Sequence, residues 1–273
     1  MKQEVVRTVL RALYARVLRS SARELDPAVL RRSAVVFAPH QDDETLACGG
    51  TIIRKRQLGA DVKIVFLTDG TQSHRDLIQT DELKMLRTQE ALAAGAVLGV
   101  SAANVFFLGF EDGKLDQNQA AAIEKVKEIL ASFRPEEVFI PYSREKPADH
   151  SQTNRIVLAA VKQCRMALVV NEYPVWFWGR WPWIVAGGQQ NRLWTDIKKS
   201  LRDDCGYLIK DFNSSVSIRP VLERKRLALE SHQSQMNRLA PDQRWQTLPD
   251  VSQGEFLACF FQDREWFYRY SIQ

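Results

Sequence analysis

Short apolar runs alternate with longer amphipathic segments along the chain from residue 34 onward. The apolar runs are typical of buried strands, which are expected at 34–38, 62–67, 105–108, 138–141 and 167–170. The segments between them show helical spacing of apolar residues, and helices are expected at 45–58, 81–98, 119–133 and 151–163. Thr80 or Asp81 is the expected cap of the second helix, and Pro135 ends the third.

This alternation, without hairpin turns between the runs, predicts βαβ units. The expected fold class is α/β, a Rossmann-like open and mostly parallel sheet with helices on both faces. The alternation fails after residue 172, so we expect an irregular insert over about 172–218, followed by a helix at 219–237. The aromatic tail at 254–270 predicts a C-terminal α+β extension that packs back on the core.

Each strongly polar cluster of this region directly follows an expected strand. HQDDE follows the first strand, TDGTQSHR the second, GFEDG the third and PYSREKPADH the fourth. In open parallel sheets, ligands bind outside the carboxyl ends of the strands. The four clusters are therefore expected to meet at one rim and to form a site.

Positive charge is concentrated at the N-terminus. Residues 1–32 hold eight Lys or Arg and three acidic residues, and the resulting +5 equals the formal net charge of the whole chain. The remainder is neutral overall, which argues against nucleic acid as a partner.

Residues 1–33 are expected to form a basic amphipathic helical extension of a single domain at 34–273. One face of that helix carries Val6, Leu10, Leu13 and Val17. In one interpretation this face docks on the core or on another subunit, and in the other the helix rests on an anionic membrane surface. The sequence leaves a monomer and a homo-oligomer both open.

The four cysteines are widely spaced and form no CxxC pair. This spacing indicates a reducing compartment and no structural zinc knuckle. No apolar run approaches the roughly 18 residues of a membrane span, and arginines interrupt the N-terminal segment too often for a signal peptide. We therefore expect a cytoplasmic protein, with peripheral contact at the inner membrane face as the alternative.

The stretch His40-Gln41-Asp42-Asp43-Glu44 has the residue types of half a metal site. Imidazole with carboxylate suits Zn²⁺ or Fe²⁺, and we expect one divalent ion, with Zn²⁺ preferred. His40 and Asp43 are the expected ligands, and His150, just past the fourth strand, is the expected third. Such a set leaves positions open for water and substrate, as catalytic sites do. The competing interpretation is that the three acids only cap a helix.

Asp42 stands beside a ligand without needing to be one, so it is the candidate general base for an activated water.

The sequence around these residues resembles a known family. FAPHQDDETLACGGTI is similar to the signature of the PIG-L, or LmbE-like, metal-dependent N-acetylglucosamine de-N-acetylases. Other segments resemble the family in the same order, namely FLTDG at 66–70, RTQEALAAGAVLGV at 87–100, LGFEDGKL at 108–115, PADH at 147–150 and KRLALESHQSQ at 225–235.

The resemblance implies an LmbE-like fold and hydrolysis of the acetamide of an N-acetylated amino sugar. It implies His40, Asp43 and His150 as metal ligands and Asp42 as general base. Arg75 and Asp112 resemble residues that hold sugar hydroxyls or a neighbouring group. The acceptor could be a glycolipid, a polysaccharide precursor or another glycoconjugate.

Two positions depart from the family pattern. Gln41 stands where proline is frequent, and we expect that position to contribute backbone. Pro147 stands where many members have a histidine that acts as general acid, which leaves Asp42 itself, His232 or His74 for that role. His232 is either a buried histidine or a residue that lines the site, and His74 is expected in a solvated loop. Asp149 is expected to support catalysis by orienting His150 or another group.

The segment WFWGRWPW at 176–183 leaves three interpretations open: a core or subunit contact, stacking on sugar rings, or contact with a lipid. Two rival function classes also remain. One is a nucleotide-sugar-dependent transferase, although no Gly-rich phosphate loop follows the first strand. The other is a sugar-binding protein on the same fold that has lost turnover.

Overall fold

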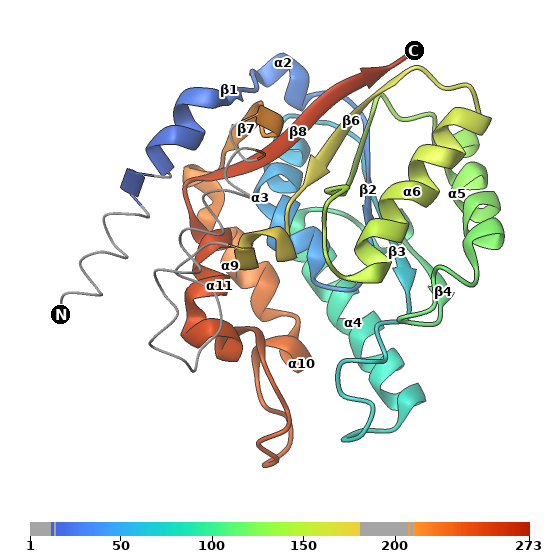
Figure 1. Cartoon of the computed structure of the whole chain (residues 1–273), viewed down its shortest axis with the longest axis vertical. Coiled ribbons are helices and arrows are strands. Elements are labelled where there is room, and N and C mark those ends of the chain that lie inside the picture. The colour runs from blue at the N-terminus through green and yellow to red at the C-terminus, as the bar shows by residue number, and fades with distance from the viewer. Residues whose placement is uncertain (1–11, 14, 181–206, 208–209) are drawn as a thin grey trace.

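An eight-stranded sheet forms the centre of the protein in a computed structural model that describes residues 12–13, 15–180, 207 and 210–273 (Figure 1). The spatial order of the strands is β1-β7-β8-β6-β5-β2-β3-β4. Their bounds are β1 Arg23–Glu24, β2 Ala34–Ala38, β3 Val62–Thr68, β4 Val105–Phe110, β5 Glu137–Pro141, β6 Leu168–Tyr173, β7 Ser214–Ser217 and β8 Arg264–Ile272. The strands from β2 to β6 are mutually parallel, as the alternating pattern predicts.

Helices cover both faces of the sheet (Figure 1). Strand β2 is apolar on both sides, so each face needs a helical layer to bury it. Val35 and Phe37 pack in one cluster with α5 (Gln119–Phe133) and α6 (Ala148–Gln163). Val36 faces the opposite way, into a cluster with α3 (Asp43–Gln57), α4 (Thr80–Leu98) and α9 (Leu222–Glu230). This arrangement confirms the predicted α/β class.

The strand order reverses between β2 and β5. From β2 the chain proceeds outward to β3 and β4, and after β4 it crosses back to place β5 and β6 on the other side. In such sheets the crevice outside the carboxyl ends at the switch point is the usual ligand site. The segments that follow β2 and β5 are the HQDDE and PADH motifs, so the topology brings these motifs together.

Two expectations for the C-terminal half need correction. The aromatic tail is not set apart as an extension, because β8 lies inside the sheet and pairs antiparallel with both β6 and β7. The single helix expected at 219–237 is wrong, since the chain turns at Ser231 and His232 between α9 and the short α10 (Gln233–Met236). The turn lets Ser234 bind the Glu90 carboxylate through its amide at 2.6 Å and its hydroxyl at 2.7 Å.

Other boundaries differ by a few residues. Helices α3 and α6 begin earlier than expected, with acidic residues in their first turns. The N-cap of α4 is Gln79 and not Thr80 or Asp81. Much of the expected insert at 172–218, residues 181–206 and 208–209, lies outside the described residues.

The N-terminal segment is tied to the sheet where it is described. Residues 12, 13 and 15–21 are helical, whereas Val6 and Leu10 of the expected apolar face lie outside the described residues. Leu13 of that face is 55% exposed, and Leu18 enters the core instead. Strand β1 then pairs with β7. No helix of the described part is long and apolar enough to cross a membrane.

Gly50 in α3 lies where no side chain fits. A Cβ there would lie 2.6 Å from Ile218 Cβ, inside contact distance. We predict that Gly50→Ala lowers the free energy of unfolding by about 1–3 kcal/mol, because overpacking outweighs the helix propensity of alanine. Denaturant unfolding measures this, and Gly179→Ala is the control because its Cβ would meet no atom of the described residues within 4 Å. An unchanged midpoint for Gly50→Ala would contradict the close approach.

Candidate metal centre and active-site cavity

The turn between β2 and α3 carries the HQDDE motif and is held by the end of β3. Thr68 donates its amide and its hydroxyl to the Pro39 carbonyl at 3.0 and 2.8 Å. Gln41 Nε2 donates in return to the Thr68 carbonyl at 3.0 Å. Gln41 therefore contributes a side-chain hydrogen bond as well as backbone, which the sequence analysis did not expect.

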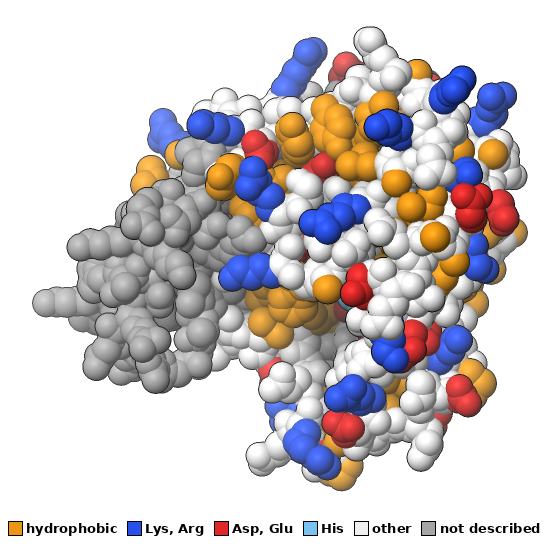
Figure 2. All heavy atoms as spheres, turned by 45° about the vertical axis from the view of Figure 1, so that its right-hand side comes forward, with side chains coloured by type: hydrophobic (Ala, Val, Ile, Leu, Met, Phe, Trp, Pro, Cys, Tyr) orange, Lys and Arg blue, Asp and Glu red, His pale blue; other side chains and the backbone are white. Residues whose placement is uncertain are grey.

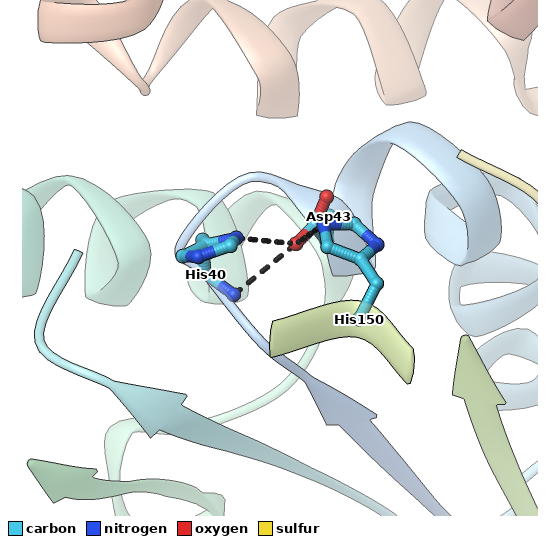
Figure 3. Close-up of side chains that lie close together, drawn as sticks. All are labelled: His40, Asp43 and His150. Atoms are coloured by element: carbon cyan, nitrogen blue, oxygen red, sulfur yellow. Dashed lines mark hydrogen bonds and ion pairs between the residues drawn. The ribbon is translucent and has the colours of Figure 1, made fainter. Parts of the chain in front are cut away.

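His40, Asp43 and His150 converge at this turn (Figure 3). Asp43 Oδ2 lies 3.2 Å from His40 Nδ1 and 3.4 Å from His150 Nε2, and it also accepts the His40 amide at 3.1 Å. Ligands bound at about 2.0–2.1 Å in a tetrahedral arrangement are separated by about 3.3 Å. The observed separations therefore suit a small divalent cation held by the three side chains.

His150 supplies an independent test of that fit. Its side chain is fully buried, and neither ring nitrogen makes a hydrogen bond within the described part of the chain. Burial lowers the pKa of His150 to about 4, although the Asp43 carboxylate opposes the change. The ring is therefore neutral, with a lone pair available beside Asp43. A buried, unsatisfied and neutral imidazole is costly alone and suited to metal ligation.

The far side of His40 is held by two more carboxylates. His40 Nε2 lies 3.1 Å from Asp112 Oδ1 and 3.6 Å from Asp149 Oδ2. Backbone amides fix both acids, since Gln72 donates to Asp112 at 2.9 Å and Gly113 donates to Asp149 at 2.6 Å. An imidazole whose far nitrogen meets a carboxylate has a defined tautomer and is a better ligand. Asp149 thus lies against His40, and not in hydrogen-bond contact with His150.

Asp42 is buried at the start of α3 with a φ of 147°. Its amide donates to Glu44 Oε2 at 3.0 Å, which helps to hold this strained backbone. Burial raises the pKa of Asp42 to about 7, and the Arg87 guanidinium, 3.6 Å from Oδ1, limits the increase. The carboxyl lines the cavity, where it can take and release a proton near neutral pH.

Arg87 on α4 is a site residue that the sequence analysis missed. It is 2% exposed, and it donates to the carbonyls of Gln41 at 2.6 Å and Gly70 at 2.8 Å. Gly70 has a φ of +68°, and a Cβ there would lie 2.8 Å from the guanidinium. Arg87 therefore fixes the backbone on both sides of the cavity floor. No local signal in the sequence marks Arg87, because the same face of the helix also carries Glu90.

His232 lies against Glu44 of the HQDDE motif, and it is not among the described residues that line the cavity. Its Nε2 lies 3.2 Å from Glu44 Oε1, and both side chains are buried. Burial lowers the pKa of His232, but the Glu44 carboxylate outweighs it and the net pKa is raised. His232 therefore supports Glu44, which holds the Asp42 amide. A contact of His232 with substrate stays a prediction.

His74 and Arg75 follow β3 and differ from each other. His74 is 4% exposed and stacks on Trp245 with ring centroids 4.4 Å apart, so the expectation of a solvated residue is wrong. Arg75 is exposed, contacts Gln72 Oε1 at 2.9 Å, and does not appear among the described cavity residues. A role for Arg75 in holding a sugar stays a prediction.

A cavity of about 400 Å³ opens above these groups. Polar and apolar side chains both line it. The polar residues among the described ones are His40, Asp42, Asp43, Gln72, Ser73, His74, Arg87, Asp112, Gln235, Gln246 and Thr247, and the apolar ones are Leu46, Pro147, Val175, Trp176, Leu248 and Val251.

Comparison with known proteins agrees with this geometry. The model of the PIG-L family, described as GlcNAc-PI de-N-acetylase, matches residues 35–161. A 1D-myo-inositol 2-acetamido-2-deoxy-alpha-D-glucopyranoside deacetylase of Mycobacterium sp. (strain JLS) is 28% identical over 74% of this chain and 73% of its own. A diacetylchitobiose deacetylase of Thermococcus kodakarensis is 29% identical over 48% of this chain and 49% of its own.

The fold has the same relatives. The crystal structure of N,N'-diacetylchitobiose deacetylase from Pyrococcus horikoshii superposes with a TM-score of 0.63 over 99% of this chain and 93% of its own, at 19% identity. The family model matches residues 35–161, which run from β2 to most of α6 and include His40, Asp42, Asp43 and His150. The chain therefore matches the PIG-L family model over the part that carries these four residues.

Proposed function

We propose that this protein is a metal-dependent hydrolase that removes the N-acetyl group from an N-acetylglucosamine-type sugar. The observation that carries the proposal is the set His40, Asp43 and His150, of which His40 and Asp43 line one cavity together with the buried carboxyl of Asp42. The deacetylases among the relatives support the reaction type.

One divalent ion would be held by His40, Asp43 and His150. Two imidazoles and one carboxylate favour Zn²⁺, and Fe²⁺ is the second candidate. The ion would polarise the acetamide carbonyl and lower the pKa of an attacking water. The side chains of the protein would orient the ligands and carry the proton.

Asp42 takes the proton of the attacking water and delivers a proton to the departing amine. Its position in the cavity and its raised pKa suit both directions of transfer. Asp112 and Asp149 keep His40 in one tautomer and orientation. Arg87 keeps the Gln41–Asp42 backbone in place and faces the Asp42 carboxylate. The products are acetate and a glucosamine-type sugar.

Metal removal tests the proposal directly. Purified protein is treated with a chelator, and acetate release is measured from a panel of N-acetylglucosamine conjugates before and after one equivalent of Zn²⁺ or Fe²⁺ is added. We expect the chelated protein to lose nearly all activity and one bound equivalent to restore it. The metal content of each sample is measured in parallel. Full activity from protein without metal would overturn the proposal.

The alternative of a nucleotide-sugar-dependent transferase receives less support. The turn after β2 is held by side chains and offers three buried acids, whereas a phosphate site needs free backbone amides or cations. Metal bound at one equivalent without acetate release from any conjugate would return attention to a sugar-binding protein on the same fold.

A further inference from the structure

The lining of the cavity combines a polar part, called the floor here, with a set of apolar side chains, called the wall. The floor includes Asp42 and two of the proposed metal ligands, His40 and Asp43. The wall is formed by Leu46, Val175, Trp176, Leu248 and Val251, which come from three separate parts of the chain. Deacetylation of a single sugar needs only the floor, so the wall is available for the group attached to that sugar.

Trp176 is the exposed member of this wall. Its side chain is 37% exposed, which is unusual for a tryptophan between two buried neighbours, Val175 and Phe177. The indole stacks on Phe256, with ring centroids 4.7 Å apart and planes inclined by 20°. Phe256 is fully buried and packs edge-on against Phe260. A tryptophan supported on one side and open to a cavity presents a flat surface for a ring.

The backbone beneath Trp176 is fixed by a buried carboxylate. Glu145, which is 5% exposed, accepts the amide of Val175 at 2.7 Å and the amide of Phe177 at 3.1 Å. The indole is thus held between two anchored residues. A platform that is already ordered loses little conformational entropy when a ligand stacks on it.

Charge on the lining restricts what the attached group can be. Among the described cavity residues the only Lys or Arg is Arg87, whose guanidinium already binds the carbonyls of Gln41 and Gly70 and faces Asp42. Asp42, Asp43 and Asp112 contribute carboxyl groups. A phosphate at this wall would find no free cation on the described lining. The amides of Gln72, Gln235 and Gln246 suit uncharged hydroxyl groups instead.

We infer that Trp176 is the specificity platform for an uncharged ring, such as a second sugar, attached to the N-acetylated sugar. This inference rests on the proposed function, and it narrows the substrate class to neutral glycans. The apolar face of the second ring stacks on the indole, and its hydroxyl groups meet the amides at the rim. Substrates with a phosphate at that position are disfavoured.

Three substrates that share the same N-acetylglucosamine unit separate these possibilities. They are the methyl glycoside, a β-linked disaccharide of two N-acetylglucosamine units, and N-acetylglucosamine 1-phosphate. We expect kcat/KM for the disaccharide to exceed that for the methyl glycoside by about two- to tenfold, the range of one aromatic ring contact. The phosphate ester should be the poorest of the three.

Variants assign the preference to the indole. Trp176→Ala should raise KM for the disaccharide by about two- to tenfold with little change in kcat, and should raise KM for the methyl glycoside by less. Trp176→Phe should restore most of the preference. Tyr207→Ala is the matched control, because Tyr207 is also 37% exposed and does not belong to the described cavity lining.

The outcomes separate this inference from the proposed function. An equal loss on both substrates in Trp176→Ala, or equal use of the phosphate ester and the disaccharide, would overturn the platform. If no substrate releases acetate, the proposed function fails, and calorimetric binding of the disaccharide decides the platform alone. Binding that Trp176→Ala weakens would support it, and no binding by the wild type would overturn it.

Discussion

Asp42→Asn should lower kcat/KM for acetate release by about 10²–10⁴-fold and leave the bound metal in place. Asparagine has the size of aspartate and tolerates a positive φ better than most residues, which matters at a φ of 147°. It cannot accept the proton of an attacking water. The His40–Asp43–His150 set does not include residue 42, so metal stoichiometry should stay at one. Steady-state kinetics and metal analysis on the same sample measure both.

Two further variants make this result interpretable. Asp43→Asn should lose the metal together with activity, because Asp43 Oδ2 lies against both histidines. Asp61→Asn changes an exposed acid just before β3, at the amino end of the strand and away from the site, and should behave as wild type. If Asp42→Asn loses its metal, Asp42 acts by supporting the site. If it retains full activity, the general base is another residue.

Lys225→Met should lower the free energy of unfolding by about 3–5 kcal/mol, the cost of leaving one buried charge without its partner. Lys225 and Glu265 are buried and pair at 2.8 Å. Lys225 also donates to the carbonyl of Leu46 at 2.7 Å, while Glu265 accepts the amides of Gly50 and Thr51 at 2.8 and 2.7 Å. In an uninterrupted α-helix the Leu46 carbonyl is the partner of the Gly50 amide. The ion pair is thus joined to the middle of α3.

The double variant separates charge from shape. Lys225→Met with Glu265→Gln removes both charges, and we expect it to recover part of the stability lost in the single variant. Lys125→Met, at an exposed position of α5, is the matched control and should change stability by less than about 0.5 kcal/mol. Denaturant unfolding measures all three. A single variant as stable as the control would show that the pair does not stabilise α3.

The residues of the candidate site differ in how far the sequence alone could predict them. His40, Asp42, Asp43 and His150 follow two strands in a short, polar pattern, and their convergence follows from the rule that carboxyl ends share one rim. Arg87 lies in the middle of a helix with no local mark of function, and only the path of α4 beside the β2–α3 turn assigns its contacts. Trp176 carries no mark that separates it from its buried neighbours Phe177 and Trp178.

The alternation of apolar runs and amphipathic segments by itself determined the class of fold, the parallel strands β2 to β6 and the motifs at their ends, because each of these depends on local periodicity and short spacing. Only the tertiary structure decided the antiparallel insertion of β8, the break before His232 and the attachment of Lys225 and Glu265 to α3. Those features depend on pairs distant in sequence, such as Glu44 with His232 and Gly50 with Glu265. Burial and charge pairing in the folded chain stabilise these contacts, and no local sequence pattern predicts them.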